Sequence, residues 1–253
     1  MATSSVATAV TQRPSDSSSA LQQEARFSAA FLRRHGWRLL FLFAALLLPL
    51  WGFIEIADEV HEAETFAFDE PVLLFAHDMA RAGFDRIFLF FSAIGYEYGV
   101  VPFDVLLVLG LAIRRRFREG LFAAVALGGS ALLNLATKQF FARERPSLWE
   151  SIAPENTFSF PSGHAMGSAT LACVLILLAW RTRWRWPTVV AMLLFVAMVG
   201  LSRIYLGVHY PSDILAGWLA ATAWAMGCYT VVFNGHLRPW RTQVPAGQPP
   251  SGK

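Results

Sequence analysis

Long apolar segments separated by short charged turns constrain this chain more than any other feature. They run over 37–57, 91–113, 121–141, 163–180, 187–206 and 211–233. A helix needs about 20 mostly apolar residues to cross a bilayer, because each residue adds about 1.5 Å. Hydrophobic residues make up 55% of the 253 residues and charged residues only 15%, which excludes an ordinary soluble domain. We therefore expect an all-α integral membrane protein, a bundle of six transmembrane helices.

The second segment is the least regular, because it contains Glu97, Pro102 and Asp104. Its span could instead begin with the apolar stretch 87–94, after a short interfacial helix around 72–82 that connects the first two spans. Carboxylates inside a bilayer are often functional. We leave Asp104 unassigned, since its depth depends on where the span begins.

The sequence on either side of these segments has a different character. Residues 1–36 begin with a stretch rich in Ser, Thr, Ala and Gln that lacks apolar periodicity, which predicts a disordered tail. A cleaved signal peptide is not expected, because the region before the first apolar segment is too long. We expect one membrane domain over 37–233 and a C-terminal tail over 234–253.

Arginines cluster at alternate ends of the apolar segments. They are Arg33, Arg34 and Arg38 around the first segment, Arg114, Arg115, Arg116 and Arg118 after the second, Arg181, Arg183 and Arg185 after the fourth, and Arg238 and Arg241 after the sixth. Basic loops stay on the cytoplasmic side. We expect cytoplasmic termini, an outer connector over 58–90, and a place in the bacterial cytoplasmic (inner) membrane. The net charge of +3 thus reflects orientation rather than a nucleic-acid partner.

Charged and imidazole side chains also gather at the opposite, outer ends of the last four segments. They are Lys138, Arg143, Arg145, His164, Arg203, His209 and Asp213. Each charge placed near lipid needs a partner, so their convergence predicts a pocket for an anionic group. For Arg143 alone, an interfacial anchor that reaches the headgroups is the better explanation.

Two short motifs in this set predict phosphate chemistry. In Pro161-Ser162-Gly163-His164, Ser162 can cap a helix, Gly163 lets the backbone approach a ligand, and helix N-termini bind phosphate. In 202–213, Pro211 places Asp213 one helical turn after His209. Asp213 can then accept the Nδ1 proton of His209 and leave Nε2 as a nucleophile, or cap the helix, or do both.

The remaining residues fit the other requirements of phosphoryl transfer. Lys138, Arg145 and Arg203 can neutralise the phosphoryl oxygens. His164 can protonate the leaving group and then activate water. Nothing in the sequence resembles a metal-binding cluster, so we expect metal-independent catalysis without a cofactor.

These residues resemble three ordered motifs of the type 2 phosphatidate phosphatase superfamily, the lipid phosphate phosphatases, in its bacterial membrane-embedded branch. Lys138 with Arg145-Pro146 is similar to K-x6-RP, 161–164 to PSGH, and 202–213 to SR-x5-H-x3-D. The resemblance implies a six-helix fold, a phosphohistidine at His209 and an acid/base role for His164. It also implies phosphate contacts from Lys138, Arg145, Ser162, Gly163 and Arg203.

The function expected from this pattern is hydrolysis of a lipid phosphate or diphosphate at the outer membrane face. Undecaprenyl diphosphate, phosphatidylglycerophosphate and phosphatidate are the candidate substrates. A phosphotransferase that passes the phosphoryl group from a polyprenyl diphosphate to another lipid is an alternative. A non-catalytic lipid-phosphate transporter is a third, but binding alone does not need the His209 and Asp213 pair.

Overall fold

The computed structural model describes residue 40 and residues 43–234. The chain divides into two compact units, 1–44 and 45–253. In the first unit, the described residues Leu40, Phe43 and Ala44 are helical. The expected N-terminal tail over 1–36 and nearly all of the C-terminal tail expected over 234–253 lie outside the described residues.

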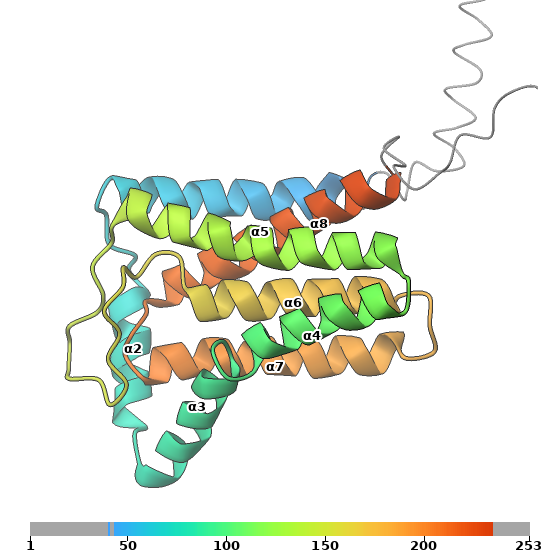
Figure 1. Ribbon diagram of the computed structural model, residues 1–253. Helices are drawn as coiled ribbons and strands as arrows, with labels where there is room; N and C mark the ends of the chain where they lie inside the picture. Colours follow the sequence, from blue (N-terminus) through green and yellow to red (C-terminus); the bar gives the residue numbers. More distant parts are fainter. Residues whose placement is uncertain (1–39, 41–42, 235–253) are drawn as a thin grey trace, which may run out of the picture. The chain divides into compact units, whose positions relative to one another are not determined.

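The second unit is built from helices. Its first helix ends at residue 61. The others are α2 (Asp69–Asp78), α3 (Ala82–Ile94), α4 (Val100–Ile113), α5 (Phe117–Phe141), α6 (Gly163–Ala179), α7 (Arg185–Tyr205) and α8 (Pro211–Asn234). The part of the chain that the structure describes contains no strand, which confirms the all-α expectation. In Figure 1 the long helices of this unit lie side by side, and α2 lies across one end of them.

Three helices are long and apolar enough to cross a membrane: Phe117–Phe141, Arg185–Tyr205 and Pro211–Phe233. Large apolar side chains such as Leu132 and Leu194 are mostly exposed on them, as lipid contact requires. Val100–Ile113 and Gly163–Ala179 are apolar but shorter. The start of the expected first span, 37–57, lies outside the described residues. The chain is thus an integral membrane protein, and the structure leaves the six-span count as an expectation.

A single helix over 91–113 was the wrong expectation, because α3 ends at Ile94 and α4 begins at Val100. The turn between them is so tight that a Cβ on Gly99 would lie 2.1 Å from the carbonyl oxygen of Ile94. Only glycine allows this approach. The interfacial helix expected around 72–82 corresponds to α2, which ends at Asp78, and α3 follows as a separate helix.

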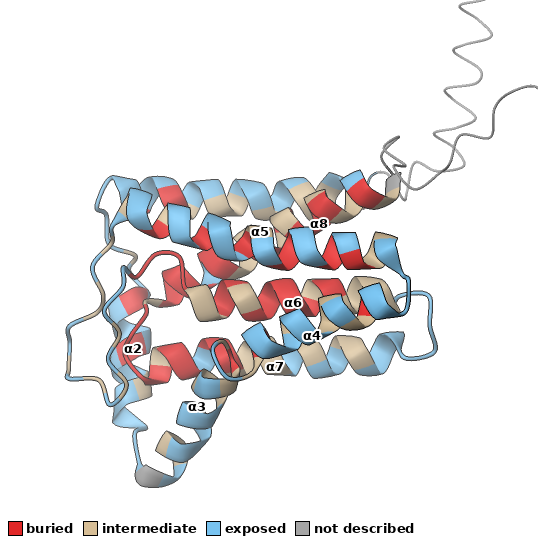
Figure 2. Cartoon of the chain, in the orientation of Figure 1, coloured by how far each residue is buried: buried red, intermediate tan, exposed pale blue. Residues whose placement is uncertain are grey.

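The core of the second unit is centred on α6, which packs against α5, α7 and α8. Phe122 of α5, Val174 of α6 and Cys228 of α8 belong to one buried apolar cluster. Figure 2 shows that burial is densest along α6 and at the end of the unit near α2. Most of the buried polar residues belong to that end: Asp69, Lys138, Ser159, Ser162, Arg203, His209, Ser212 and Asp213. The fold therefore buries charge where the sequence predicted an anion site.

Candidate active site

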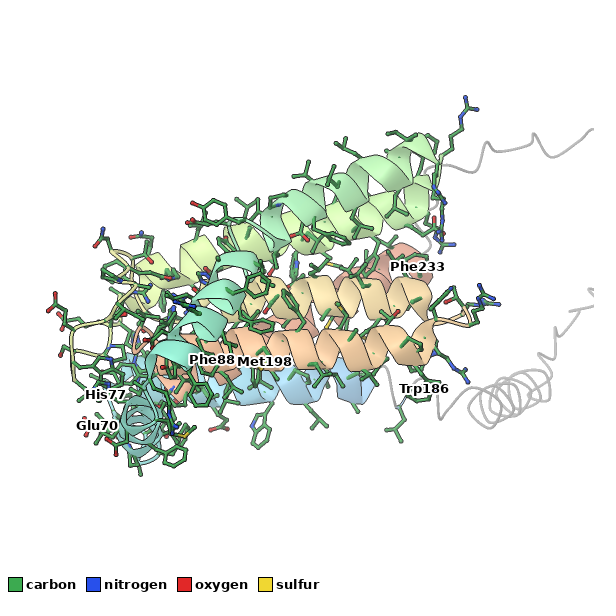
Figure 3. The ribbon with its side chains drawn as sticks, turned by 90° about the horizontal axis from the view of Figure 1, so that it is seen from below. Glu70, His77, Phe88, Trp186, Met198 and Phe233 are labelled. Carbon is green, nitrogen blue, oxygen red and sulfur yellow. The ribbon has the colours of Figure 1, made fainter. Side chains whose placement is uncertain are left out.

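The site forms where the last turn of α5, the 142–162 loop, the start of α6 and the α7–α8 connection meet. Glu70 and His77 of α2 mark this end in Figure 3, while Trp186 and Phe233 mark the opposite end. Helix α5 has 25 residues and is about 37 Å long, so Lys138 near its C-terminus is far from the arginines that precede it. The site residues thus share one end of the bundle, as the motif spacing predicted.

His209 is completely buried in the connection between α7 and α8. Two residues earlier, Gly207 has a φ of +67° that favours glycine, and a Cβ there would lie 2.5 Å from the Trp149 ring. The left-handed residue turns the chain so that Val208 and His209 point inward, where both are buried. The backbone therefore presents the imidazole to the site before α8 begins.

Asp213 lies beside His209, but a serine stands between the two side chains. The Asp213 Oδ2 atom is 3.5 Å from His209 Nδ1. Ser159 donates its hydroxyl proton to Asp213 Oδ2 at 2.5 Å, and its Oγ is 3.3 Å from His209 Nδ1. Asp213 Oδ2 also accepts the backbone N–H of Tyr210 at 2.9 Å. The expected direct hydrogen bond between His209 and Asp213 is therefore a longer contact, and Ser159 lies near both side chains. No motif in the sequence pointed to Ser159.

The three expected phosphate cations converge next to the imidazole. The Arg145 Nη1 atom is 3.1 Å from His209 Nε2 and donates to the carbonyl of Val208 at 2.6 Å. Lys138 donates to the hydroxyl of Thr157 at 3.1 Å. Arg203 is 1% exposed, and its guanidinium bonds the hydroxyl of Ser92. Positive charge thus surrounds the ring nitrogen that the sequence predicted to be the nucleophile.

Glu155, which the sequence did not single out, occupies the centre of this cluster. Its carboxylate pairs with Arg145 at 2.6 Å and with Arg203. Its oxygens are 3.7 Å from His164 Nδ1 and 3.9 Å from His209 Nε2. An anion therefore already sits between the two histidines and the two arginines. The only sequence sign is a carboxylate in the loop just before the PSGH motif.

The PSGH motif forms the N-terminus of α6, as expected. Ser162 caps the helix by accepting the backbone N–H of Ala165 at 3.4 Å. A Cβ on Gly163 would lie 3.0 Å from the side-chain oxygen of Asn134, so a larger residue would crowd this start. His164 points toward Glu155 and is tilted against the ring of Tyr96, 5.3 Å between centroids. The structure thus brings both histidines to one anion position.

Arg143 is not the interfacial anchor that we expected. It donates to Asp213 at 2.6 Å and to Asp69 of α2 at 3.1 Å, and it is largely buried. A side chain that reaches headgroups would have its guanidinium in the interface rather than between two carboxylates. Arg143 and Asp69 are therefore residues of the site that sequence reasoning missed.

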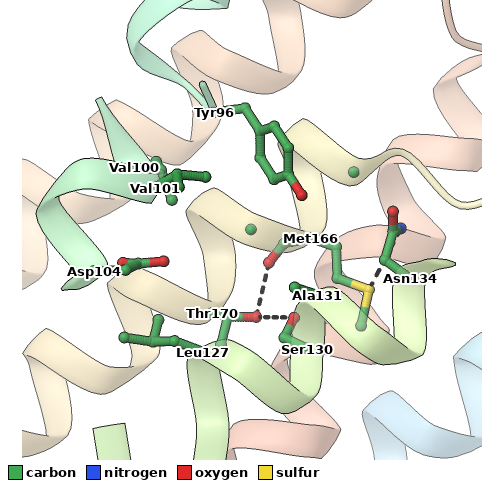
Figure 4. A pocket seen from close by; sticks show the side chains of 12 residues that line it. Tyr96, Val100, Val101, Asp104, Leu127, Ser130, Ala131, Asn134, Met166 and Thr170 are labelled. Carbon is green, nitrogen blue, oxygen red and sulfur yellow. Dashed lines mark hydrogen bonds between the residues drawn. The ribbon is translucent and has the colours of Figure 1, made fainter. Parts of the chain in front are cut away.

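A small cavity with a few polar side chains on its wall lies next to the PSGH motif, between α4, α5 and α6 (Figure 4). Its volume is about 40 Å³, and it reaches from Gly163 to Asp104. Ser130 and Thr170 hydrogen-bond each other at 2.8 Å on its wall. Within the described part of the chain, the buried Oδ1 of Asp104 has no hydrogen-bond partner. The carboxylate that the sequence left unassigned thus faces a space large enough for water.

Burial and the neighbouring arginines favour a neutral His209 beside an ionised Glu155. Burial lowers the pKa of His209 well below its ordinary 6.5, and the charges of Arg145 and Arg203 lower it further. Burial alone would raise the pKa of Glu155, but the charges of Arg203 and Arg145 outweigh it and hold that pKa below its usual value. His209 Nε2 therefore keeps its lone pair at neutral pH, as a nucleophile must.

Comparison with known proteins finds one matching family model and several relatives that are named phosphatases. The model of the PAP2 superfamily matches residues 119–236, which include every residue of the motifs. The phosphatidylglycerophosphatase B of Bacillus subtilis (strain 168) is 26% identical over 171 residues, which cover 66% of this chain and 84% of that protein. The undecaprenyl-diphosphatase of Sulfolobus acidocaldarius is 30% identical over 143 residues, covering 54% and 66% of the two chains.

A solved structure shares the fold. It is that of the transmembrane PAP2 type phosphatidylglycerolphosphate phosphatase from Bacillus subtilis, with a TM-score of 0.67 and 23% identity. The similarity covers 78% of this chain and 100% of that one. At this identity the likeness concerns the fold, whereas the family match concerns the sequence that builds the site.

Proposed function

Because the chain belongs to the PAP2 superfamily, we propose that it is a membrane phosphatase that removes phosphate from a lipid phosphate or diphosphate. Its relatives are named phosphatases, and the chain is accordingly a hydrolase. One observation carries the lipid phosphatase mechanism. His164, His209, Arg145 and Arg203 all face a single position, which a carboxylate now fills.

The reaction runs in two steps at that position. His209 Nε2 attacks phosphorus, the bond between phosphorus and the leaving oxygen breaks, and His164 protonates that oxygen. Water then attacks the phosphohistidine, His164 takes its proton, and the N–P bond breaks to release inorganic phosphate. Lys138, Arg145, Arg203 and the α6 N-terminus stabilise the phosphoryl oxygens throughout.

The active site lies on the non-cytoplasmic face in this proposal. Arg118 donates to the carbonyls of Val232 and Phe233, so the arginine-rich turn before α5 and the end of α8 are neighbours. That end is opposite to His209. The positive-inside rule places it in the cytoplasm. With six spans, both termini are then cytoplasmic, and in a bacterial inner membrane the site faces the periplasm.

The substrate is a lipid such as phosphatidylglycerophosphate, undecaprenyl diphosphate or phosphatidate. Two of these are suggested by relatives named phosphatidylglycerophosphatase B and undecaprenyl-diphosphatase. Catalysis needs no metal, because two histidines and three cations already supply the nucleophile, the acid and the charge neutralisation.

Phosphate release from these three lipids tests the proposal. We expect the purified protein to release inorganic phosphate from at least one of them, at the same rate with and without EDTA. A rate that EDTA abolishes and added divalent cation restores would contradict the metal-independent mechanism. Loss of the lipid phosphate without release of inorganic phosphate, and with a newly phosphorylated lipid, would identify a phosphotransferase instead.

Glu155 must leave the phosphate position before a substrate can enter it. We expect Glu155→Gln to lower KM about fivefold, because the variant competes more weakly for Arg145 and Arg203. The Glu155 charge also raises the pKa of His209. Since only neutral histidine attacks, its removal should move the acid limb of kcat/KM to lower pH.

Rate profiles from pH 4 to 9 for the wild type, Glu155→Gln and the exposed loop control Glu150→Gln measure both effects. The control should match the wild type. A higher KM in Glu155→Gln, or an acid limb displaced toward higher pH, would show that Glu155 assists the substrate rather than occupying its place.

A further inference from the structure

The carboxylate of Asp213 is fixed from both sides. Its Oδ2 accepts from Ser159 and from the Tyr210 backbone, as described above, and faces His209. Its Oδ1 accepts from Arg143 Nη1 at 2.6 Å. The side chain is completely buried, so no solvent competes for these bonds. The position of Asp213 relative to His209 therefore depends on Arg143.

Arg143 is in turn held by the first residue of α2. Its Nη2 donates to Asp69 Oδ2 at 3.1 Å, and its Nη1 donates to Ser212 Oγ at 2.8 Å. Asp69 is only 2% exposed and also accepts from Ser212, from the backbone N–H at 2.9 Å and from the hydroxyl at 2.6 Å. The Arg143 guanidinium lies over the ring of Tyr210, 4.2 Å from its centroid. The Asp69 side chain thus bonds Ser212 at the start of α8 and Arg143, which itself bonds Asp213 of α8.

We propose that Asp69 and Arg143 are positioning residues for phosphoryl transfer, through which α2 holds Asp213 in place and preserves its negative charge beside His209. The proposal rests on the phosphohistidine mechanism given above. It adds a role for the connector between the first helix and α3, in which the sequence shows no motif. Asp69 lies outside the three spaced motifs, and Arg143 is one of the unspecified residues between Lys138 and Arg145.

The charge balance explains why two carboxylates share one arginine. Paired with Arg143 alone, Asp213 would form a neutral ion pair and would offer little to a positive imidazole. Asp69 supplies a second carboxylate, so the three side chains together carry one net negative charge. Transfer of a phosphoryl group to His209 creates positive charge on a ring whose Nδ1 is 3.5 Å from Asp213. Interactions between charges are strong in such a buried site, so Asp69 stabilises the transition state rather than the bound substrate.

The test compares Asp69→Asn, Asp69→Glu and Arg143→Lys with the control Glu70→Gln, an exposed carboxylate that follows Asp69 in α2. We expect Asp69→Asn to lower kcat about tenfold with KM unchanged, as loss of a residue behind a reacting group commonly does. Asp69→Glu and Arg143→Lys keep the charges and should retain more activity. Glu70→Gln should behave as the wild type. Rapid-quench measurement of phosphoenzyme formation should show that this step is the one slowed.

Two outcomes would overturn the proposal. One is a wild-type kcat in Asp69→Asn. The other is an equal loss in folded Asp69→Asn and Asp69→Glu, which would make the effect one of shape instead of charge. Thermal unfolding of each variant in detergent identifies the folded ones. If Asp69→Asn does not fold, Arg143→Lys provides the test: lysine lacks the fork of donors that bonds Asp69 and Asp213 together, so its kcat should lie below that of the wild type, and a wild-type kcat would overturn the proposal.

A different variant, at His209, tests the proposed function itself. A His209 variant as active as the wild type would remove the phosphohistidine mechanism whatever Asp69 does. If His209 proves essential while Asp69→Asn has wild-type kcat, only the positioning role fails.

Discussion

Replacing His209 by glutamine is expected to lower the rate of phosphate release by at least about 10⁴-fold, the scale on which loss of a catalytic nucleophile acts. Glutamine has a similar length and keeps a hydrogen-bonding group near Arg145 and Ser159, which now lie 3.1 and 3.3 Å from the imidazole nitrogens. The glutamine amide is not a nucleophile and cannot form the N–P bond of the covalent intermediate. The structure around it should survive, so the loss should fall on the chemical step.

Trapping of the intermediate distinguishes this loss from misfolding. Wild-type protein quenched in alkali after brief mixing with ³²P-labelled lipid should carry acid-labile, base-stable radioactivity, and His209→Gln should carry none. His61→Gln is the matched control, because His61 is exposed and its ring stacks on Phe140, which is not one of the residues expected to contact phosphate. Equal labelling of His209→Gln and the wild type would place the covalent step on another residue.

The elements that the sequence predicted well are those set by local pattern. The expected segments 121–141, 187–206 and 211–233 correspond to α5, α7 and α8 within a few residues. Apolar runs of that length have one stable form in a bilayer, the helix. The Ser162 cap followed from the same local reasoning, because a serine before a helix has its partner three residues away.

The tight turn between α3 and α4 did not follow from the pattern. Apolar residues continue on both sides of 95–99, and hydropathy alone does not reveal a turn of the backbone. Two glycines were the available sign, at Gly95 and Gly99. Glycine is tolerated inside membrane helices, however, so its presence does not by itself end one.

The sequence predicted which motif residues would lie together, but not which side chains would pair with them. The motifs bring Lys138, His164 and His209 to one end because helix lengths place them there. Glu155 and Ser159 lie in a loop without periodicity, and their partners are far away in sequence. For Arg143, the sequence favoured a headgroup anchor, and this prediction was wrong because α2 brings Asp69 close enough to pair with it beside Asp213.

Glu155 neutralises part of the positive charge of the site. A buried cluster of cations without an anion would be costly, and one carboxylate removes most of that cost. The same carboxylate bonds Arg145 and Arg203, one oxygen to each, and two phosphate oxygens would take the places of these two carboxylate oxygens. The donors that pair with Glu155 are thus the same ones that would bind the phosphate of a substrate. This double use makes it necessary to separate the structural role of Arg203 from its catalytic one.

Arg203→Met is expected to lower kcat/KM by about 10²- to 10³-fold, the cost of losing one charged donor to a developing phosphoryl anion. Arg203 is suited to this task, because its Nε is buried and has no partner among the described residues, so one donor remains for a substrate oxygen. The variant also deprives Glu155 of a partner. We expect a loss of about 2 kcal/mol in stability, less than for a fully buried pair because Glu155 keeps Arg145.

The double variant Arg203→Met/Glu155→Leu separates the two effects. Replacing both members of a buried ion pair with apolar side chains is often neutral or stabilising, but Glu155→Leu also removes the partner of Arg145, so thermal unfolding in detergent should recover only part of the lost stability. The kcat/KM value should remain low, because the donor to the phosphoryl group is still missing. Measuring both quantities for the two single variants and the double variant completes a double-mutant cycle. If activity recovers together with stability, Arg203 serves the fold by pairing Glu155 and takes no part in binding the phosphoryl group.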